Sequence, residues 1–211
     1  MTEAWLWGLS ALAALAYGLI FSHRPPSLIR TLVKCLAVGA LAVIAYLEGG
    51  SVLLALALTL CTVGDAFLAG DPKRWLPLGL AAFLMGHVVY APLLGAHGAS
   101  PSTVFWIAAL AVLAAAGLML RALWSSLGPL RLPVIAYVVA IVCMVIAGLL
   151  LPARVWPATA GALAFMASDA ILSYDLFKGA KLLGSPRLTA WVIWFLYWGG
   201  QVGICWGMLG A

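Results

Sequence analysis

Two aspartates lie inside apolar stretches of the sequence. Asp65 belongs to CTVGDAFLAGD, residues 61–71, and Asp169 to MASDAILSYD, residues 166–175. Both stretches read Asp-Ala-x-Leu, with a second aspartate six positions after the first. A charged group inside a bilayer costs on the order of several kcal/mol and marks a functional site or an internal pair. Two buried carboxylates are the minimum requirement for general acid–base catalysis, so we interpret Asp65 and Asp169 as a candidate catalytic pair.

Few other polar side chains fall within the apolar runs. They are Lys34, His87, Gln201 and the tyrosines Tyr90, Tyr137, Tyr174 and Tyr197. Each has a structural interpretation beside a functional one: a packing histidine or tyrosine, a glutamine that bonds between helices, or a lysine that reaches the interface. The aspartates have one too, as members of an internal ion pair or hydrogen bond, with Lys34 as a plausible partner.

A second pair of acids, Asp71 and Asp175, falls where the apolar runs end. We interpret these two residues as boundary residues that cap a helix and pair with Lys73, Arg74 or Lys178.

Composition identifies the class of protein. Hydrophobic residues make up 66% of the 211 residues and charged residues only 8%, with a mean hydropathy of +1.15. A soluble domain carries about 25% charged residues, so a solvated globule is excluded. The basic residues behind the net charge of +5 lie in short loops, which is typical of membrane topology and not of nucleic-acid binding. We expect one membrane domain over residues 1–211, whose first apolar run is a span and not a cleaved signal peptide.

Eight apolar runs approach the roughly 20 residues that cross a bilayer. They cover residues 4–21, 31–47, 51–69, 76–94, 102–120, 132–151, 158–173 and 189–209. The second and seventh runs are short, so we expect helix tilt or local thinning of the bilayer there. The predicted fold is an all-α bundle of eight transmembrane helices.

Basic residues predict the orientation of this bundle. The loops after the first, third, fifth and seventh runs hold ten lysines and arginines, and the other loops hold only Arg154. By the positive-inside rule, the basic loops face the cytoplasm and both termini face outward. Asp65 and Asp169 then lie on parallel helices, each about four residues or roughly 6 Å before its cytoplasmic end. The repeated motif suggests two four-helix halves related by a weak parallel repeat.

Several other chemistries are not expected. The sequence contains no GxSxG and no GxxxxGK[ST] motif. His23 and His97 fall in loops on opposite membrane faces, so His87 cannot join them in a three-histidine metal centre. The cysteines lie singly in apolar runs and are predicted to be buried free thiols; they are Cys35, Cys61, Cys143 and Cys205. We expect neither a metal ion nor a cofactor.

Together these motifs resemble the YhhN-like lysoplasmalogenase family of multi-pass membrane proteins. Vertebrate members of that family hydrolyse the vinyl-ether bond of lysoplasmalogens. The resemblance rests on Lys34 and on residues 58–70, 78–92, 161–177 and 196–201, in the family's order over nearly the whole chain. Two positions depart from the family pattern: Cys35 stands where proline is frequent, and Gly200 where alanine is common. Neither departure involves the two aspartates.

The resemblance implies an intramembrane hydrolase that uses water to convert a lysophospholipid into a fatty aldehyde and a glycerophospho-headgroup. One aspartate would protonate the vinyl ether, and the other would stabilise the cation and activate water. The sequence does not say which aspartate does which, and it does not give the oligomeric state. The family's distribution favours a bacterial inner membrane.

Supporting residues are also expected from the resemblance. Lys34 would hold the phosphate, and His87, Tyr90, Tyr197 and Gln201 would line the pocket. The alternative function is a small proton-coupled transporter or a lipid-binding membrane protein that uses the same pair of aspartates.

Overall fold

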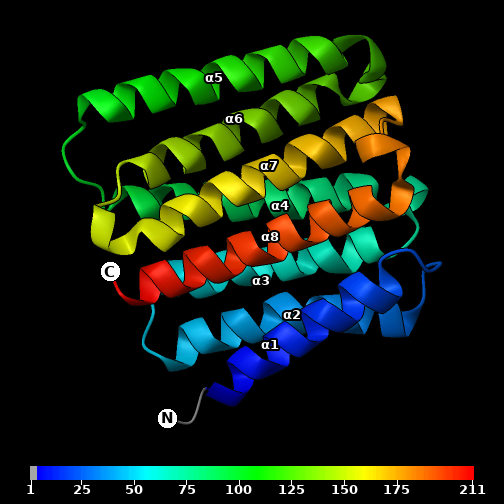
Figure 1. Ribbon diagram of the computed structural model, residues 1–211, viewed down its shortest axis with the longest axis horizontal. Coiled ribbons are helices and arrows are strands. Elements are labelled where there is room, and N and C mark those ends of the chain that lie inside the picture. The colour runs from blue at the N-terminus through cyan, green and yellow to red at the C-terminus, as the bar shows by residue number, and fades with distance from the viewer. Residues whose placement is uncertain (1–3) are drawn as a thin grey trace.

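A computed structural model describes residues 4–211, apart from the side chains of residues 72 and 73, and these residues form eight long helices (Figure 1). The helices are α1 (Ala4–Ala16, continued by a π-helical turn, Tyr17–Phe21), α2 (Leu28–Leu47), α3 (Val52–Ala69), α4 (Pro72–Gly95), α5 (Thr103–Leu123), α6 (Arg131–Leu149), α7 (Trp156–Lys178) and α8 (Pro186–Leu209). Each lies in a segment long and apolar enough to cross a membrane. The predicted all-α bundle of eight transmembrane helices is confirmed.

The second and seventh spans are not short, so the expected tilt or thinning is not required. Helix α2 has 20 residues and α7 has 23. Helix α2 begins early because the Ser27 hydroxyl accepts a hydrogen bond from the Arg30 amide, at 3.2 Å. Helix α7 continues through the polar residues after position 172 and ends only at Gly179, whose φ of 64° suits a residue without a Cβ. The apolar runs stop short of these ends because each added turn contains charged residues: Arg30 in α2, and Asp175 and Lys178 in α7.

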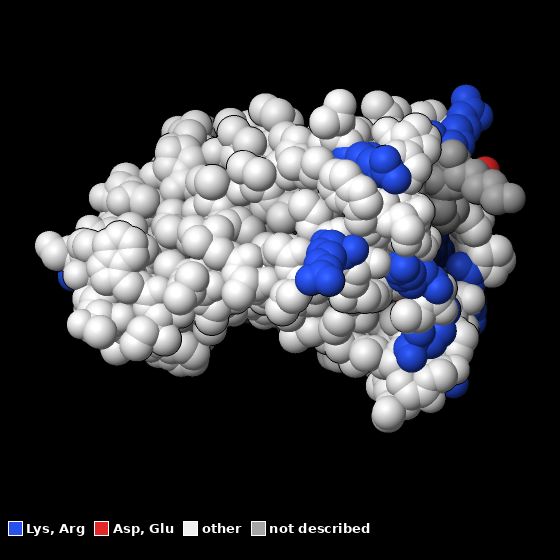
Figure 2. Space-filling model, turned by 90° about the horizontal axis from the view of Figure 1, so that it is seen from above, with Lys and Arg blue, Asp and Glu red and all other residues white. Residues whose placement is uncertain are grey.

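The charged residues divide the bundle into two ends. The loops α1–α2, α3–α4, α5–α6 and α7–α8 lie at one end, and both termini lie at the other (Figure 1). Figure 2 shows most of the lysines and arginines of its face gathered at the first end, which we call the basic end. The distribution predicted from the loops is therefore the distribution in space.

The helices pack mostly against their neighbours in the chain, with one exchange between the two halves. Helix α4 packs against α6, and α8 packs against α2 and α3. Each half therefore extends its last helix into the other half. This reciprocal contact fits the expected relation between two four-helix halves, and it brings the two aspartate-bearing helices α3 and α7 to a common interior.

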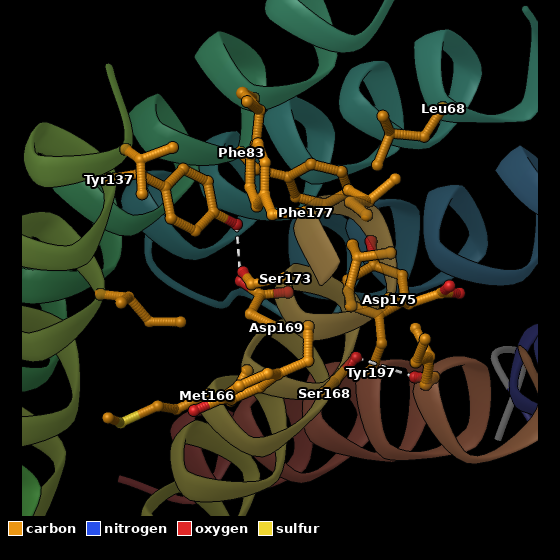
Figure 3. A pocket seen from close by; sticks show the side chains of 18 of the residues that line it. Leu68, Phe83, Tyr137, Met166, Ser168, Asp169, Ser173, Asp175, Phe177 and Tyr197 are labelled. Carbon is orange, nitrogen blue, oxygen red and sulfur yellow. Dashed lines mark hydrogen bonds between the residues drawn. The ribbon is translucent and has the colours of Figure 1, made fainter. Parts of the chain in front are cut away.

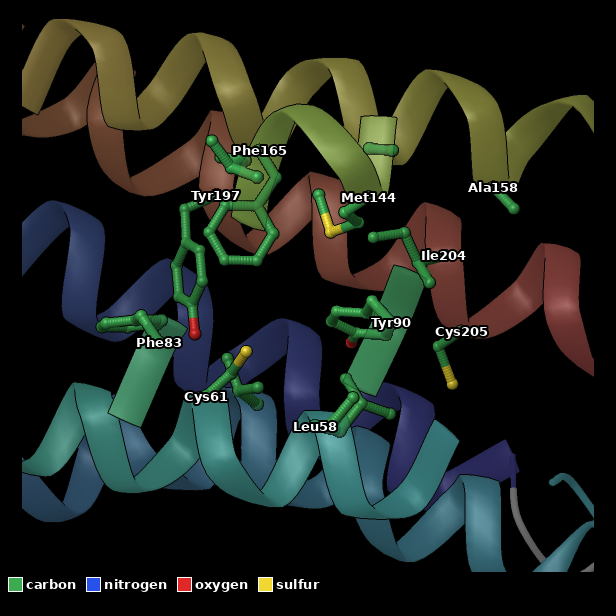
Figure 4. Close-up of a cluster of buried hydrophobic side chains, with 14 of the residues drawn as sticks. Leu58, Cys61, Phe83, Tyr90, Met144, Ala158, Phe165, Tyr197, Ile204 and Cys205 are labelled. Atoms are coloured by element: carbon green, nitrogen blue, oxygen red, sulfur yellow. The ribbon is translucent and has the colours of Figure 1, made fainter. Parts of the chain in front are cut away.

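An aromatic cluster fills the bundle between α3, α4, α7 and α8 (Figure 4). The ring of Phe83 lies edge-on to those of Phe165 and Tyr197, with centroids 6.2 and 5.6 Å apart. Phe165 and Tyr197 also meet edge to face, at 5.1 Å. These ring contacts join α4, α7 and α8.

The cysteines are free, as predicted, but not all of them are buried. Cys61 and Cys205 are buried, Cys35 is partly exposed and Cys143 is exposed. Cys143 lies on the outer face of α6. The sequence did not predict this exposure, because an apolar span has no polar face to reveal which side points to lipid. The expectation of four buried thiols is therefore wrong for Cys143.

Helices α7 and α8 approach each other more closely than ordinary side chains allow. A Cβ on Gly161 would lie 2.5 Å from the carbonyl oxygen of Gly200, and one on Gly203 would lie 2.6 Å from the oxygen of Pro157. Small residues at a membrane helix interface permit this contact between backbones, and lost van der Waals packing is the main cost of widening it.

Gly161→Ala should therefore destabilise the bundle by about 1–3 kcal/mol, because the new methyl group forces α7 away from α8. Gly117→Ala is the matched control, since a Cβ at Gly117 on α5 meets no atom within 4 Å. We expect a clearly lower melting temperature in detergent for the first variant and no loss for the second. Equal melting temperatures for the two variants would contradict the close α7–α8 packing.

Candidate active site

A cavity of about 550 Å³ lies within the basic-end part of the bundle (Figure 3). All eight spans contribute to its lining, and most of the lining side chains are apolar. Asp65 and Asp169 both face it. The structure therefore brings together the two residues that the sequence selected, in a chamber that suits a molecule with a long apolar part.

Asp65 is fully buried and bound by two groups from different helices. The Lys34 ammonium on α2 lies 2.9 Å from Oδ1, and the Tyr197 hydroxyl on α8 donates a hydrogen bond to Oδ2 at 2.7 Å. Lys34 also lies over the rings of Tyr17 and Trp194, with its nitrogen 5.6 and 5.7 Å from their centroids. An ammonium this close interacts favourably with a carboxylate in its charged form.

This arrangement changes the role expected for Lys34. Its side chain is only 11% exposed and is committed to Asp65, so Lys34 is not placed as a free phosphate ligand. The neighbouring Arg30 is committed as well: it donates to the Tyr17 hydroxyl and to the carbonyl oxygens of Phe21 and Ala69. Of the three roles that the sequence suggested for Lys34, the internal ion pair is the one that the structure shows.

Asp169 has a different environment. The Tyr137 hydroxyl on α6 donates a hydrogen bond to its Oδ2 at 2.5 Å, and its side chain is 15% exposed in the cavity (Figure 3). The nearest cationic candidate is the His87 ring on α4, whose Nε2 lies 3.9 Å from the same oxygen. Asp169 therefore faces two groups that are neutral in their common forms, whereas Asp65 faces a lysine.

The depths of the two aspartates along their helices also differ from expectation. Asp65 lies four residues before the end of α3, as predicted. Asp169 lies nine residues before the end of α7, because that helix continues to Lys178. At 1.5 Å per residue, Asp169 is about 13 Å from its helix end. Their common cavity, and not an equal distance from a helix end, relates the two residues.

Tyr90 and Gln201 do not line the cavity, contrary to prediction. Both are fully buried, and the Tyr90 hydroxyl donates to Oε1 of Gln201 at 2.6 Å. They lie about one turn further from the basic end than His87 on α4 and Tyr197 on α8, because side chains four residues apart follow one helix face away from the cavity. Their bond links α4 to α8 behind the aromatic cluster. His87 is buried behind the cavity wall too, whereas Tyr197 does line it.

Asp71 lies at a helix boundary as expected, whereas Asp175 lies inside the last turn of α7 and lines the cavity. Asp175 pairs with Lys181 in the following loop and not with Lys178. The carbonyl oxygen of Asp71 accepts hydrogen bonds from the first-turn amides of Arg74 and Trp75. The expected pairing of Asp71 with Lys73 lies outside the described side chains.

Tyr137 is a site residue that the sequence did not distinguish from the other tyrosines of the spans. A signal was present: Tyr137 lies six residues after the start of α6, and Lys34 lies six residues after the start of α2. Each aspartate thus receives one group from the helix before its own and faces one from the last helix of the other half. Because a tyrosine in an apolar run is usually a packing residue, this match becomes meaningful only with the helices in place.

Comparison with known proteins identifies the family of this chain. The model of the YhhN family matches residues 29–208. The chain is 35% identical over 153 residues to a protein named lysoplasmalogenase from Mycobacterium bovis, and equally similar to one of the same name from Mycobacterium tuberculosis. Each alignment covers 69% of this chain and 56% of the relative, so the chain spans little more than half the length of the curated relatives it matches. No solved structure matches the chain. Because the family match extends from α2 to α8 and includes both aspartates, the chain belongs to the YhhN family.

Proposed function

We propose that this protein is an intramembrane alkenyl-ether hydrolase that cleaves lysoplasmalogens with water, giving a fatty aldehyde and a glycerophospho-headgroup. Family membership and the name shared by its two relatives support this reaction. The site supports it independently, because two buried carboxylates share one largely apolar cavity. A single-chain lipid fits such a cavity, with its tail among apolar side chains and its polar end toward the basic end of the bundle.

The observation that carries the mechanism is the difference between the groups that neighbour the two carboxylates. Asp65 has the Lys34 ammonium at 2.9 Å, which favours the charged form. Among the described side chains, Asp169 receives only a tyrosine hydroxyl within hydrogen-bond distance, so the buried neutral acid is favoured there. We therefore assign Asp169 as the general acid and Asp65 as the carboxylate that stabilises positive charge and acts as the base.

The reaction proceeds in two balanced stages. Asp169 gives its proton to the vinyl-ether carbon that does not bear oxygen, which produces an oxocarbenium ion. Water adds to the adjacent carbon while Asp65 takes a proton from it, which gives a hemiacetal. Asp65 then returns that proton to the glycerol oxygen as the carbon–oxygen bond breaks, and Asp169 takes the hydroxyl proton of the hemiacetal. Aldehyde and alcohol leave, and both aspartates regain their starting states.

Asp65→Asn and Asp169→Asn should each lower kcat for aldehyde release by at least about 100-fold, because an amide can neither give nor accept the catalytic proton. Purified protein is supplied with a lysoplasmalogen, and aldehyde is measured by mass spectrometry. Asp71→Asn is the matched control and should retain activity, since Asp71 lies at a helix boundary. Size-exclusion chromatography checks folding. Full activity in either of the first two variants would rule out the two-carboxylate mechanism, and lipid movement without cleavage would favour a carrier instead.

Lys34→Met should abolish turnover near neutral pH. Removing one partner of a buried ion pair leaves a charge whose burial costs about 3–5 kcal/mol, so Asp65 would take up a proton and cease to act as a base. Lys34→Arg keeps the positive charge and should recover part of the rate. Lys178→Met, on the exposed end of α7, is the control. Equal rates for the Met and Arg variants at position 34 would contradict the role assigned to the ammonium.

We also infer that the basic end faces the cytoplasm of a bacterial inner membrane, in accord with the positive-inside rule. Ser126 lies in the α5–α6 loop at the basic end, and Ser100 lies in the α4–α5 loop at the opposite end; both are exposed. With a membrane-impermeant maleimide, Ser100→Cys should react in intact cells and Ser126→Cys only after permeabilisation. The four native cysteines, all within spans, provide the unmodified background. The reverse labelling pattern would require the opposite orientation.

A further inference from the structure

We propose that His87 is a positioning residue for the general acid: it donates an N–H hydrogen bond to Asp169 only after Asp169 has lost its proton. The inference rests on the proposed function, in which Asp169 alternates between a neutral acid and a carboxylate. His87 does not touch the substrate in this scheme, because it lies behind the cavity wall.

The first observation is that His87 is buried without a hydrogen-bond partner. Its exposed fraction is 0%, and among the described residues neither ring nitrogen makes a hydrogen bond. Buried polar groups are nearly always paired, and an unpaired one calls for an explanation such as a catalytic role. Nε2 of His87 lies 3.9 Å from Oδ2 of Asp169, about 1 Å beyond an ordinary hydrogen bond.

The second observation is that aromatic rings fix the direction of the imidazole. Its centroid lies 5.0 Å from that of Tyr137, edge to face, and 4.7 Å from that of Phe165. The imidazole thus lies beside two titratable groups, Tyr137 on α6 and Asp169 on α7, and beside the apolar ring of Phe165. The same tyrosine that bonds Asp169 thus also holds His87 beside it.

Comparison with Asp65 shows that the gap is specific to Asp169. Both contacts of Asp65 are closed, at 2.9 Å from Lys34 and 2.7 Å from Tyr197. At Asp169, the Tyr137 hydroxyl lies within hydrogen-bond distance at 2.5 Å, but Nε2 of His87 lies too far for a hydrogen bond, at 3.9 Å. Asp65 therefore has both of its donors in contact, whereas Asp169 has one donor in contact and a second one, His87, nearby but not bonded; we call this second group a reserve donor.

A reserve donor suits a group that changes charge during the cycle. A neutral acid gains little from a second donor, whereas a carboxylate in a low-dielectric site gains a charge-assisted hydrogen bond. An interaction present only after the proton has moved lowers the barrier to that step, because it does not stabilise the starting state equally. His87 keeps its own proton throughout, so the proton balance of the two stages is unchanged.

The kinetic test compares three variants in the aldehyde-release assay. His87→Leu should lower kcat by about 10- to 100-fold and leave KM within about twofold, since the substrate site is intact. His87→Gln retains an N–H donor and should recover at least a third of the lost rate on a logarithmic scale. His97→Leu makes the same chemical change at an exposed position beyond α4 and should be nearly silent. Equal losses in the Leu and Gln variants, or a kcat for His87→Leu equal to that for His97→Leu, would overturn the proposal.

A spectroscopic test does not depend on turnover, so it separates failure of this inference from failure of the proposed function. The carboxyl bands of Asp169 are identified by infrared difference spectra against Asp169→Asn. In His87→Leu, the band of the ionised carboxylate at high pH should shift, and the band of the neutral acid should stay in place. Movement of neither band, or of the neutral band alone, would refute a hydrogen bond specific to the carboxylate. Absence of aldehyde release by the wild type would refute only the proposed function.

Discussion

The ion pair between Lys34 and Asp65 is the interaction on which the rest of this bundle depends. A lone carboxylate at membrane depth costs about 3 kcal/mol or more, so it must find partners inside the protein. Asp65 finds them on α2 and α8, which obliges helices from the two ends of the sequence to meet around α3. Asp169 imposes a similar requirement on α4 and α6 around α7. The polar contacts thereby specify which helices adjoin one another in a chain whose apolar surfaces are nearly interchangeable.

Close backbone packing makes these contacts possible. The glycines of α7 and α8 let the two helices touch without intervening side chains, so Tyr197 on α8 can reach across to Asp65 on α3. The large side chains Phe83, Phe165 and Tyr197 instead occupy the centre. The bundle is therefore closely packed between α7 and α8, and the cavity beside this pair is lined by both carboxylates.

The two halves of the chain place similar groups in similar positions but use them differently. Lys34 and Tyr137 occupy the same turn of α2 and α6, yet one is a cation and the other a neutral hydroxyl. This single difference gives the two aspartates unequal electrostatic surroundings within one cavity. A repeat with identical partners would leave two equivalent carboxylates, and a division into acid and base needs them to be inequivalent.

Composition and local motif were enough to determine that this chain is a bundle of eight membrane helices, because hydropathy follows from the residues alone. They also identified Asp65 and Asp169, since a charge in an apolar run is visible without any structure. The sequence could not determine the partners of these residues: hydrogen bonds and ion pairs join helices far apart in the chain, and apolar spans have no polar face that reveals their neighbours. Only the tertiary structure shows that Lys34 pairs with Asp65 and is not a free phosphate ligand. The same structure shows that Tyr90 and Gln201 bond to each other outside the cavity lining, and that Tyr137 bonds to Asp169. It also placed His87 beside one aspartate and not the other, because the last helix of each half packs into its counterpart.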